Sequence, residues 1–161
     1  MSIVLSEANF LHQLIKDELD AMRNFAQLLD TEQAILVENR SAELESVTTE
    51  KNKSLSNLLA LEKTRNAHLE KNAYAKDAEG MRQLLALCDN VEMNQHWNML
   101  LEISADAQEA NRTNGLLIQR HLSRNQATLN ILHQNDQAGS MYGSDGQSKT
   151  KFGTSRGIVA R

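Results

Sequence analysis

Proline is absent from all 161 residues, and glycine is almost absent from the first 135. Average usage would give roughly eight prolines in a chain of this length. Only Gly80 and Gly115 interrupt residues 1–135, whereas the other five glycines fall within the last 23 residues. Because proline and glycine break helices, their scarcity predicts an all-α fold, an antiparallel bundle of long helices in a body formed by residues 1–135. Residues 136–161, rich in Gly and Ser, are expected to form a flexible tail.

Cysteine and long apolar runs are also scarce. The single cysteine, Cys88, cannot form an internal disulfide, which favours a reducing compartment. No apolar run approaches the ~20 residues of a membrane span. The first residues, Met1 to Leu5, lack the basic flank and apolar core of a signal peptide. We therefore expect a cytoplasmic protein with no membrane span.

Aromatic residues and basic charge are too few to define a binding class on their own. The chain has only six aromatic residues, so leucine must fill most of the core. Residues 1–50 carry 3 basic and 10 acidic groups, whereas residues 51–135 carry 10 basic and 9 acidic groups. An acidic first segment and the lack of a basic field argue against nucleic-acid binding.

The first predicted helix covers residues 4–38, because apolar residues recur there at alternating steps of three and four. Two glutamates interrupt this stripe, and Leu14, Leu28 and Ile35 widen it into the broader face of a bundle helix. The stripe consists of Ala8, Leu11, Ile15, Glu18, Met22, Phe25, Leu29, Glu32 and Leu36.

The second predicted helix starts with Ser41 as its N-cap and ends between Leu69 and Asn72. Its apolar positions again follow helical spacing, and lysines and arginines occupy much of the remainder. Because a short loop joins it to the acidic first helix, the two are expected to form an antiparallel, charge-complementary, coiled-coil-like hairpin.

A polar connection at residues 73–80 precedes a short apolar helix at 81–88, and a long last helix is expected at 91–134. Asp89 and Asn90 can end the short helix or cap the next. We expect Phe25, Trp97 and Leu101 to be buried. The stripe predicted for the last helix is apolar at both ends and polar in the middle: Trp97, Leu101, Ser104, Gln108, Asn111, Gly115, Ile118, Leu122, Asn125, Leu129 and Leu132.

The middle of that stripe is unusual, since two asparagines and a glycine between Asn111 and Gly115 each lower helix propensity. Two interpretations stay open: a helix break or tight crossing at Gly115, and a binding groove.

Motifs for catalysis are missing. A di-iron bundle needs Glu-x-x-His on two helices, and no histidine here has a glutamate three residues before it. Glu92 precedes His96 by four residues; with no second pair of this kind, we interpret the two as a solvated pair rather than metal ligands. Cys88 lies among leucines, which favours an inert thiol over a nucleophile. We expect no enzyme, no cofactor and no metal.

Three segments together resemble the FlgN family of flagellar type III export chaperones. The first is the second-helix pattern Leu44-x-x-Val47-x-x-x-Lys51-x-x-x-Leu55-x-x-Leu58-x-x-Leu61-x-x-x-Arg65. The others are Asn111-x-x-Asn114-Gly115-x-x-Ile118 and the tail sequence Tyr142-Gly143-x-Asp145-Gly146. They occur in the family's order, and the resemblance spans roughly residues 5–147.

This resemblance implies a chaperone that binds C-terminal segments of the hook-filament junction proteins FlgK and FlgL. It would prevent their premature association and deliver them to the type III export gate and its ATPase components. It places gate docking at Tyr142 and client binding in the C-terminal helical region, at Asn114, Leu117, Ile118, Leu122, Leu129 and Leu132. The alternative from the residues alone is a helical-hairpin adaptor that scaffolds a complex without delivering a client.

Overall fold

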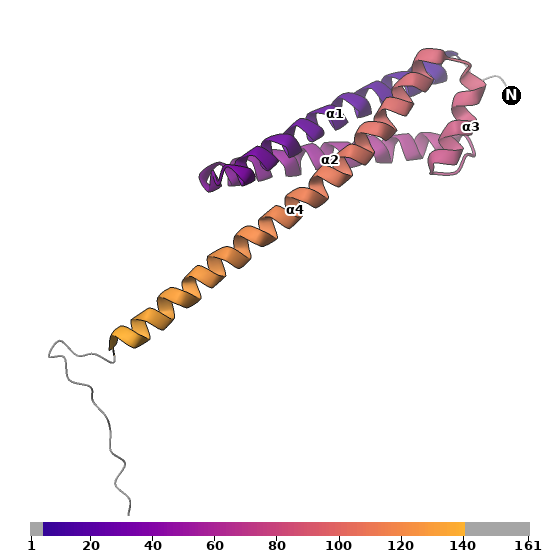
Figure 1. Ribbon diagram of the computed structural model, residues 1–161. Helices are drawn as coiled ribbons and strands as arrows, with labels where there is room; N and C mark the ends of the chain where they lie inside the picture. The colour runs from indigo at the N-terminus through magenta and orange to yellow at the C-terminus, as the bar shows by residue number, and fades with distance from the viewer. Residues whose placement is uncertain (1–4, 141–161) are drawn as a thin grey trace, which may run out of the picture. The chain divides into compact units, whose positions relative to one another are not determined.

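The computed structural model describes the backbone of residues 5–140 and the side chains of residues 6–134. Over these residues the chain forms helices and no strand, which confirms the all-α prediction (Figure 1). The chain divides into one unit that ends at Ile118 and another that begins at Gln119. Among the described residues, no helix is both long enough and apolar enough to cross a membrane. The helices are α1 (Leu5–Val37), α2 (Ser41–Lys71), α3 (Ala78–Cys88) and α4 (Val91–Ser140).

The observed bounds of α1 and α2 agree with the predicted ones to within about a residue. Helix α3 begins earlier than expected because the side chain of Asp77 accepts a hydrogen bond from the Gly80 amide and caps it. Helix α4 extends past the expected end at residue 134, to Ser140. Residues 141–161, which make up most of the predicted tail and include Tyr142, lie outside the described residues.

The three connections between helices each contain a residue in the left-handed region that is not glycine. These residues are Asn39 at φ 56°, Ala73 at φ 61° and Asp89 at φ 43°. The prediction that Ser41 caps α2 is wrong, because Arg40 occupies the cap position and makes no capping side-chain bond. Asn90 does cap α4, since its Oδ1 accepts a hydrogen bond from the amide of Met93 at 3.0 Å.

Gly80, in the first turn of α3, lets the backbone of the preceding connection pass close against the helix. A Cβ atom at this position would lie 2.0 Å from the carbonyl oxygen of Ala75. Such a contact is impossible without moving the backbone, so a side chain cannot be accommodated there. This glycine is therefore required by packing.

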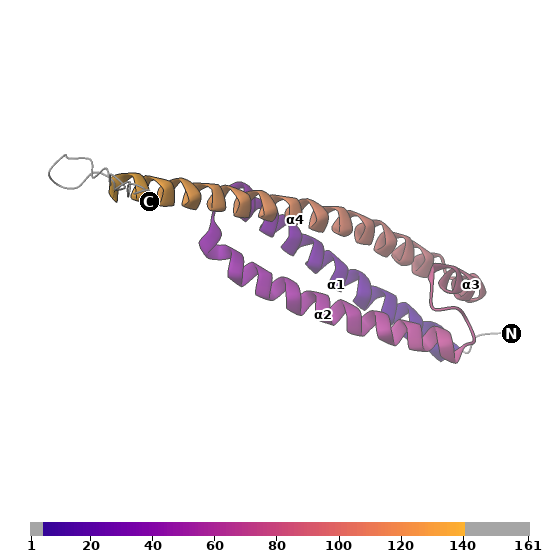
Figure 2. The same cartoon turned by 90° about the horizontal axis from the view of Figure 1, so that it is seen from below.

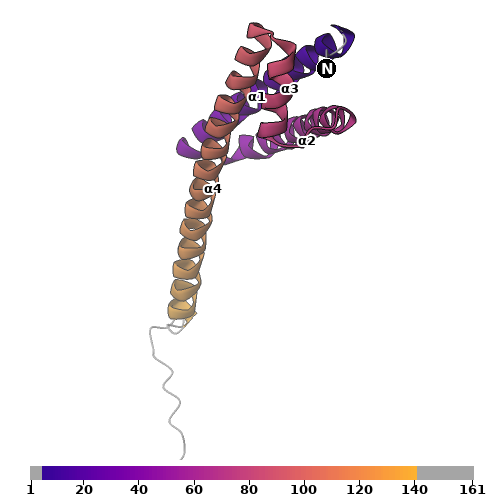
Figure 3. The same ribbon diagram turned by 90° about the vertical axis from the view of Figure 1, so that its right-hand side faces the viewer.

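The core lies where all four helices meet, at the α3 end of the hairpin. Figure 2 shows α1 and α2 side by side and antiparallel, with α3 near the end of the pair. Figure 3 shows α3 beside the first turns of α4. Short α3 thus closes this end of the hairpin with apolar side chains. The buried cluster consists of Leu11, Ile15, Leu19, Leu69, Met81, Leu84, Leu85, Met93, Trp97 and Leu100.

Six of the nine residues of the predicted α1 stripe are buried, including both glutamates, and Ala8, Met22 and Phe25 are partly buried. Glu18 and Glu32 are 5% and 1% exposed, and each pairs with a cation on α2. Lys71 of α2 also pairs with Glu7 at 3.1 Å. The acidic and basic helices therefore form the charge-complementary antiparallel hairpin that the sequence predicts.

The stripe predicted for α4 is offset from the observed one. The buried residues of α4 are Met93, Trp97, Leu100, Ala107 and Asn114. Burial of Trp97 is thus confirmed, but burial of Leu101 is wrong, because its side chain is 44% exposed. The sequence offers two adjacent leucines at 100 and 101, and helical spacing from Trp97 is compatible with either.

Phe25 is only partly buried.

A helix break or tight crossing at Gly115, one of the two interpretations of this segment, is absent. Helix α4 runs through Gly115 without a break. A Cβ atom at Gly115 would meet nothing within 4 Å, so no helix approaches it closely. The interpretation of this glycine as a break or a close crossing is therefore wrong.

Candidate functional site

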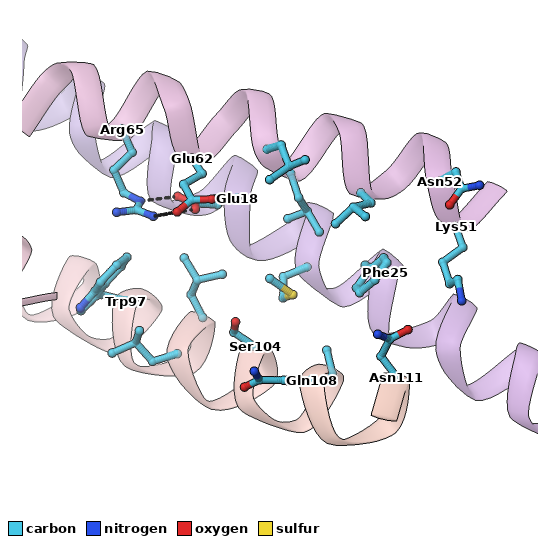
Figure 4. Close-up of a pocket in the computed structure, with 17 residues that line it drawn as sticks. Glu18, Phe25, Lys51, Asn52, Glu62, Arg65, Trp97, Ser104, Gln108 and Asn111 are labelled. Atoms are coloured by element: carbon cyan, nitrogen blue, oxygen red, sulfur yellow. Dashed lines mark hydrogen bonds and ion pairs between the residues drawn. The ribbon is translucent and has the colours of Figure 1, made fainter. Parts of the chain in front are cut away.

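An open groove of about 370 Å³ runs between α2 and α4, with α1 at its base. Side chains of α2 and α4 face each other across it (Figure 4). Leu55, Leu59 and Leu101 line it and are 43%, 55% and 44% exposed. Met22 and Phe25 of α1 lie at its base. The groove therefore presents an apolar surface between two helices, the kind of surface against which an amphipathic helix can pack.

A buried ion pair between Glu18 and Arg65, in contact with the ring of Trp97, forms one end of the groove. Arg65 donates from Nε to Oε2 of Glu18 at 2.8 Å and from Nη2 to Oε1 at 3.2 Å. Its guanidinium carbon lies 5.1 Å from the centroid of the Trp97 ring, as a cation–π contact requires (Figure 4). These contacts hold α1, α2 and α4 together at this point.

A second buried carboxylate joins the same three helices further along. Lys51 of α2 donates to Oε1 of Glu32 at 2.6 Å. Asn114 of α4 donates to Oε2 of Glu32 at 2.9 Å and to the carbonyl oxygen of Leu29 at 2.8 Å. Asn114 is 1% exposed, and its Oδ1 finds no donor among the described residues. Asn114, which lies one position before Gly115 of the predicted stripe, thus pairs a carboxylate that is buried on α1.

The unit that begins at Gln119 carries the second apolar surface, a row of leucines on one face of α4. Leu122, Leu129 and Leu132 are 63%, 50% and 55% exposed. Every side chain from 122 to 134 is exposed, so this row packs against no other described residue of its unit. We call Leu122, Leu129 and Leu132 the leucine ridge. Exposed apolar residues in a row are typical of a partner-binding surface.

The structure places the predicted client-binding residues in two different environments. Asn114 is buried against α1, where it binds Glu32, and Leu117 and Ile118 are partly buried. The three residues of the leucine ridge are exposed. Tyr142 lies outside the described residues.

A binding groove is one of the two interpretations of Asn111–Gly115, and Asn111 does line this groove, but sequence reasoning did not identify the side that α2 contributes. The feature of the sequence that could have indicated it is the wide apolar face of α2. Leu55, Leu58 and Leu59 form a face that is too wide to be buried by α1 alone. Only Leu58 of these three is buried, and the other two flank it on the open side.

Nothing in the electrostatics of the one cysteine points to reactivity. Cys88 is partly buried, and burial raises the pKa of its thiol. A raised pKa lowers the fraction of reactive thiolate at neutral pH. The side chain therefore acts as a small apolar residue beside the core cluster.

Comparison with known proteins identifies relatives over most of the chain. The family model described as FlgN protein matches residues 1–150. A flagella synthesis protein FlgN from Proteus mirabilis is 26% identical over 150 residues, which cover 92% of this chain and 96% of that protein. The protein of the same name from Yersinia enterocolitica serotype O:8 is 28% identical over 138 residues, 84% and 86% of the two chains. That from Salmonella typhimurium is 26% identical over 140 residues, 86% and 89% of the two chains. No solved structure matches the chain significantly.

Proposed function

Because the chain belongs to the FlgN family, we propose that it is a cytoplasmic flagellar export chaperone for hook-filament junction proteins of the FlgK and FlgL type. It holds the C-terminal segments of these clients, prevents their premature association and delivers them to the type III export gate. The helical body, residues 1–135, forms the client-binding part, and the tail, residues 136–161, carries the gate contact.

The observation that carries the client-binding part of this proposal is the exposed leucine ridge. A client helix with an apolar face can pack on such a ridge and bury it, gaining roughly 25 cal/mol per Å² of apolar surface removed from water. Leu117 and Ile118 belong to the unit that ends at Ile118, where they are partly exposed, and we propose them as separate client contacts of that unit. Asn114 is buried in the same unit, where its bonds to Glu32 and Leu29 fix α4 against α1.

The leucine ridge is tested by the double substitution Leu122→Gln and Leu129→Gln. Glutamine is a good helix former, so the far-UV circular dichroism should be unchanged. Loss of two apolar contacts should weaken binding of a FlgK or FlgL C-terminal segment at least tenfold, as measured by titration calorimetry.

The matched control is Leu55→Gln with Leu59→Gln, which makes the same change on two exposed leucines of the groove. This variant should bind the client with wild-type affinity. If the control loses binding and the ridge variant does not, the client site is the groove and the proposal for the ridge is wrong.

For the export gate we propose a contact through Tyr142, on a glycine-flanked segment of the tail. Gly143 and Gly146 allow turns that present the ring, and an aromatic ring gives a large contact at low ordering cost. Tyr142→Ala should reduce secretion of the junction proteins and weaken gate binding, while the chaperone–client complex is still recovered by pull-down. Loss of client binding in this variant would instead place Tyr142 in the client site.

A further inference from the structure

Two histidines and a glutamate from α1 and α4 converge beside the core. His12 of α1 and His96 of α4 are partly buried, and Glu92 lies one turn before His96 on the same helix face. One ligand atom from each of the three lies within 4.8 Å of the other two. Helical spacing in the sequence brings Glu92 and His96 to one face of α4. The fold brings His12 to the same place, although it is 84 residues away from His96 in the chain.

The spacing of the two imidazoles suits a shared cation. Nε2 of His12 and Nδ1 of His96 share a hydrogen bond of 3.2 Å, which a bound metal would replace, and the ring centroids are 5.4 Å apart. Two nitrogens bound to one Zn²⁺ at 2.0–2.1 Å with a tetrahedral angle are about 3.3 Å apart. The two nitrogens therefore already stand at the separation that coordination needs, and little movement of either helix is required.

The donor set selects the class of metal. Two neutral imidazoles and one carboxylate suit Zn²⁺ and neighbouring first-row divalent ions, whereas Mg²⁺ and Ca²⁺ prefer oxygen ligands alone. Glu92 is exposed, so its carboxylate can turn toward the histidines and leave a further position open to water. For both rings to ligate, His12 must carry its proton on Nδ1 and His96 on Nε2.

We propose that His12, Glu92 and His96 form a zinc site that ties the start of α1 to the start of α4. The residues on either side of the two histidines belong to the buried cluster: Leu11 and Ile15 on α1, and Met93 and Trp97 on α4. A metal at this point stabilises the contact between these helices, since an ion that binds only the folded state raises its stability. The site is distinct from both the groove and the leucine ridge, so it does not depend on the proposed chaperone function.

The test uses the full chain without an affinity tag, first treated with a chelator to remove metal. Titration with Co²⁺ should give the visible absorption of a tetrahedral complex at one ion per chain, and Zn²⁺ should displace it. Zn²⁺ should also raise the melting temperature of the chain in a concentration-dependent way.

Three variants decide whether the named residues are the ligands. Glu92→Gln changes an exposed side chain and should leave the fold intact, yet lower the affinity for Zn²⁺ more than about tenfold, since loss of even an outer-shell partner costs that much. His96→Ala should abolish the Co²⁺ spectrum. His133→Ala removes an exposed histidine elsewhere on α4 and should bind both metals as the wild type does.

The proposal is wrong if the wild type gives no tetrahedral Co²⁺ spectrum. It is also wrong if Glu92→Gln retains wild-type affinity, or if His133→Ala loses binding as His96→Ala does. If His96→Ala fails to fold, the Zn²⁺ affinity of Glu92→Gln still decides between the two outcomes.

Discussion

Glu18 and Arg65 meet in the interior of the helical hairpin, where both residues are less than a tenth exposed. Removing two charges from water costs several kcal/mol per ion, and close hydrogen bonds recover that cost only when both partners are present. The two bonds between these groups and the contact of Arg65 with Trp97 satisfy this condition. Removal of one partner alone should therefore lower the free energy of unfolding.

We expect Glu18→Leu alone, or Arg65→Met alone, to lower the free energy of unfolding by about 3–5 kcal/mol, because an uncompensated charge stays buried. The double variant should recover most of this loss, since two apolar side chains of similar size can pack there. Urea unfolding of all four proteins measures the coupling. As a control, Glu79→Gln breaks the exposed pair with Arg82 and should leave the urea midpoint unchanged. Equal losses in the single and double variants would contradict this account.

His68 is a second buried group with an energetic role. Burial lowers its pKa; the negative charge of Glu7 on α1 opposes this shift, and the positive charge of Lys71 adds to it. The Phe10 ring lies 5.4 Å from the imidazole, and the side-chain amide of Asn72 is 3.5 Å from its Nε2. The folded state therefore disfavours the imidazolium ion.

The direction of the resulting pH dependence follows from this shift. The unfolded chain takes up a proton at His68 near pH 6.5, whereas the folded chain resists it to lower pH. The folded state should lose stability as pH falls from about 6.5 through the lowered pKa of His68. The urea midpoint of His68→Gln should fall less over pH 7.5 to 5 than that of the wild type. His133→Gln, an exposed control, should keep the wild-type pH dependence.

At the scale of the elements, the turns are built without glycine. Asn39, Ala73 and Asp89 each adopt a positive φ, which costs an L-residue roughly 1–2 kcal/mol. Asparagine and aspartate tolerate this conformation through their short polar side chains, but alanine has no such compensation. Ala73 is therefore the most strained of the three positions.

Ala73→Gly should raise the free energy of unfolding by up to about 1 kcal/mol, because relief of strain exceeds the extra freedom of glycine in the unfolded chain. The same substitution in the interior of α2, Ala60→Gly, should lower it by about 1 kcal/mol. Chemical denaturation of both variants tests the two signs side by side. If both variants are destabilised, the turn at Ala73 is not strained.

The elements also show where sequence reasoning succeeds and where it stops. In α1 the apolar neighbours of the stripe, Leu14, Leu19 and Ile35, are buried together with it, so a broad face rather than one line of residues is predicted correctly. In α4 the stripe is ambiguous, because Leu100 and Leu101 are adjacent and because Asn114 is buried only to bind a carboxylate on α1. Helical periodicity cannot foresee that partner, since it is 82 residues distant in the sequence.

At the scale of the whole chain, the two units differ in what stabilises them. The unit that ends at Ile118 contains the buried cluster, whereas the side chains from 122 to 134 are all exposed. A helix without tertiary packing depends on intrinsic propensity, and such helices melt gradually. The candidate sites follow the same division: the residues of the leucine ridge lie on one helix, where helical spacing alone brings them to one face, whereas the groove is made by three helices that spacing within one helix does not bring together.

Two spectroscopic probes should therefore give different melting curves. Trp97 is the single tryptophan and is buried, so its fluorescence reports the packed unit. Circular dichroism at 222 nm reports all helices and should begin to decline at a lower temperature, before the Trp97 transition. Ala127→Gly should deepen this early decline without shifting the Trp97 transition. Coincident curves for both probes would show that the chain unfolds as one cooperative unit.

The two buried carboxylates have a further consequence, for the choice among alternative alignments of the hairpin. Glu18 and Glu32 are two heptads apart on α1, and their partners Arg65 and Lys51 are two heptads apart on α2. A leucine stripe alone tolerates sliding of one helix along the other by a heptad. A slip in one direction would place Glu18 opposite Leu58 and Glu32 opposite Leu44. A slip in the other direction would place Glu32 opposite Leu58 and Glu18 opposite Asn72, so each slipped pairing leaves at least one carboxylate buried against a leucine without a cation. The charges thus exclude slipped pairings that the leucines would accept.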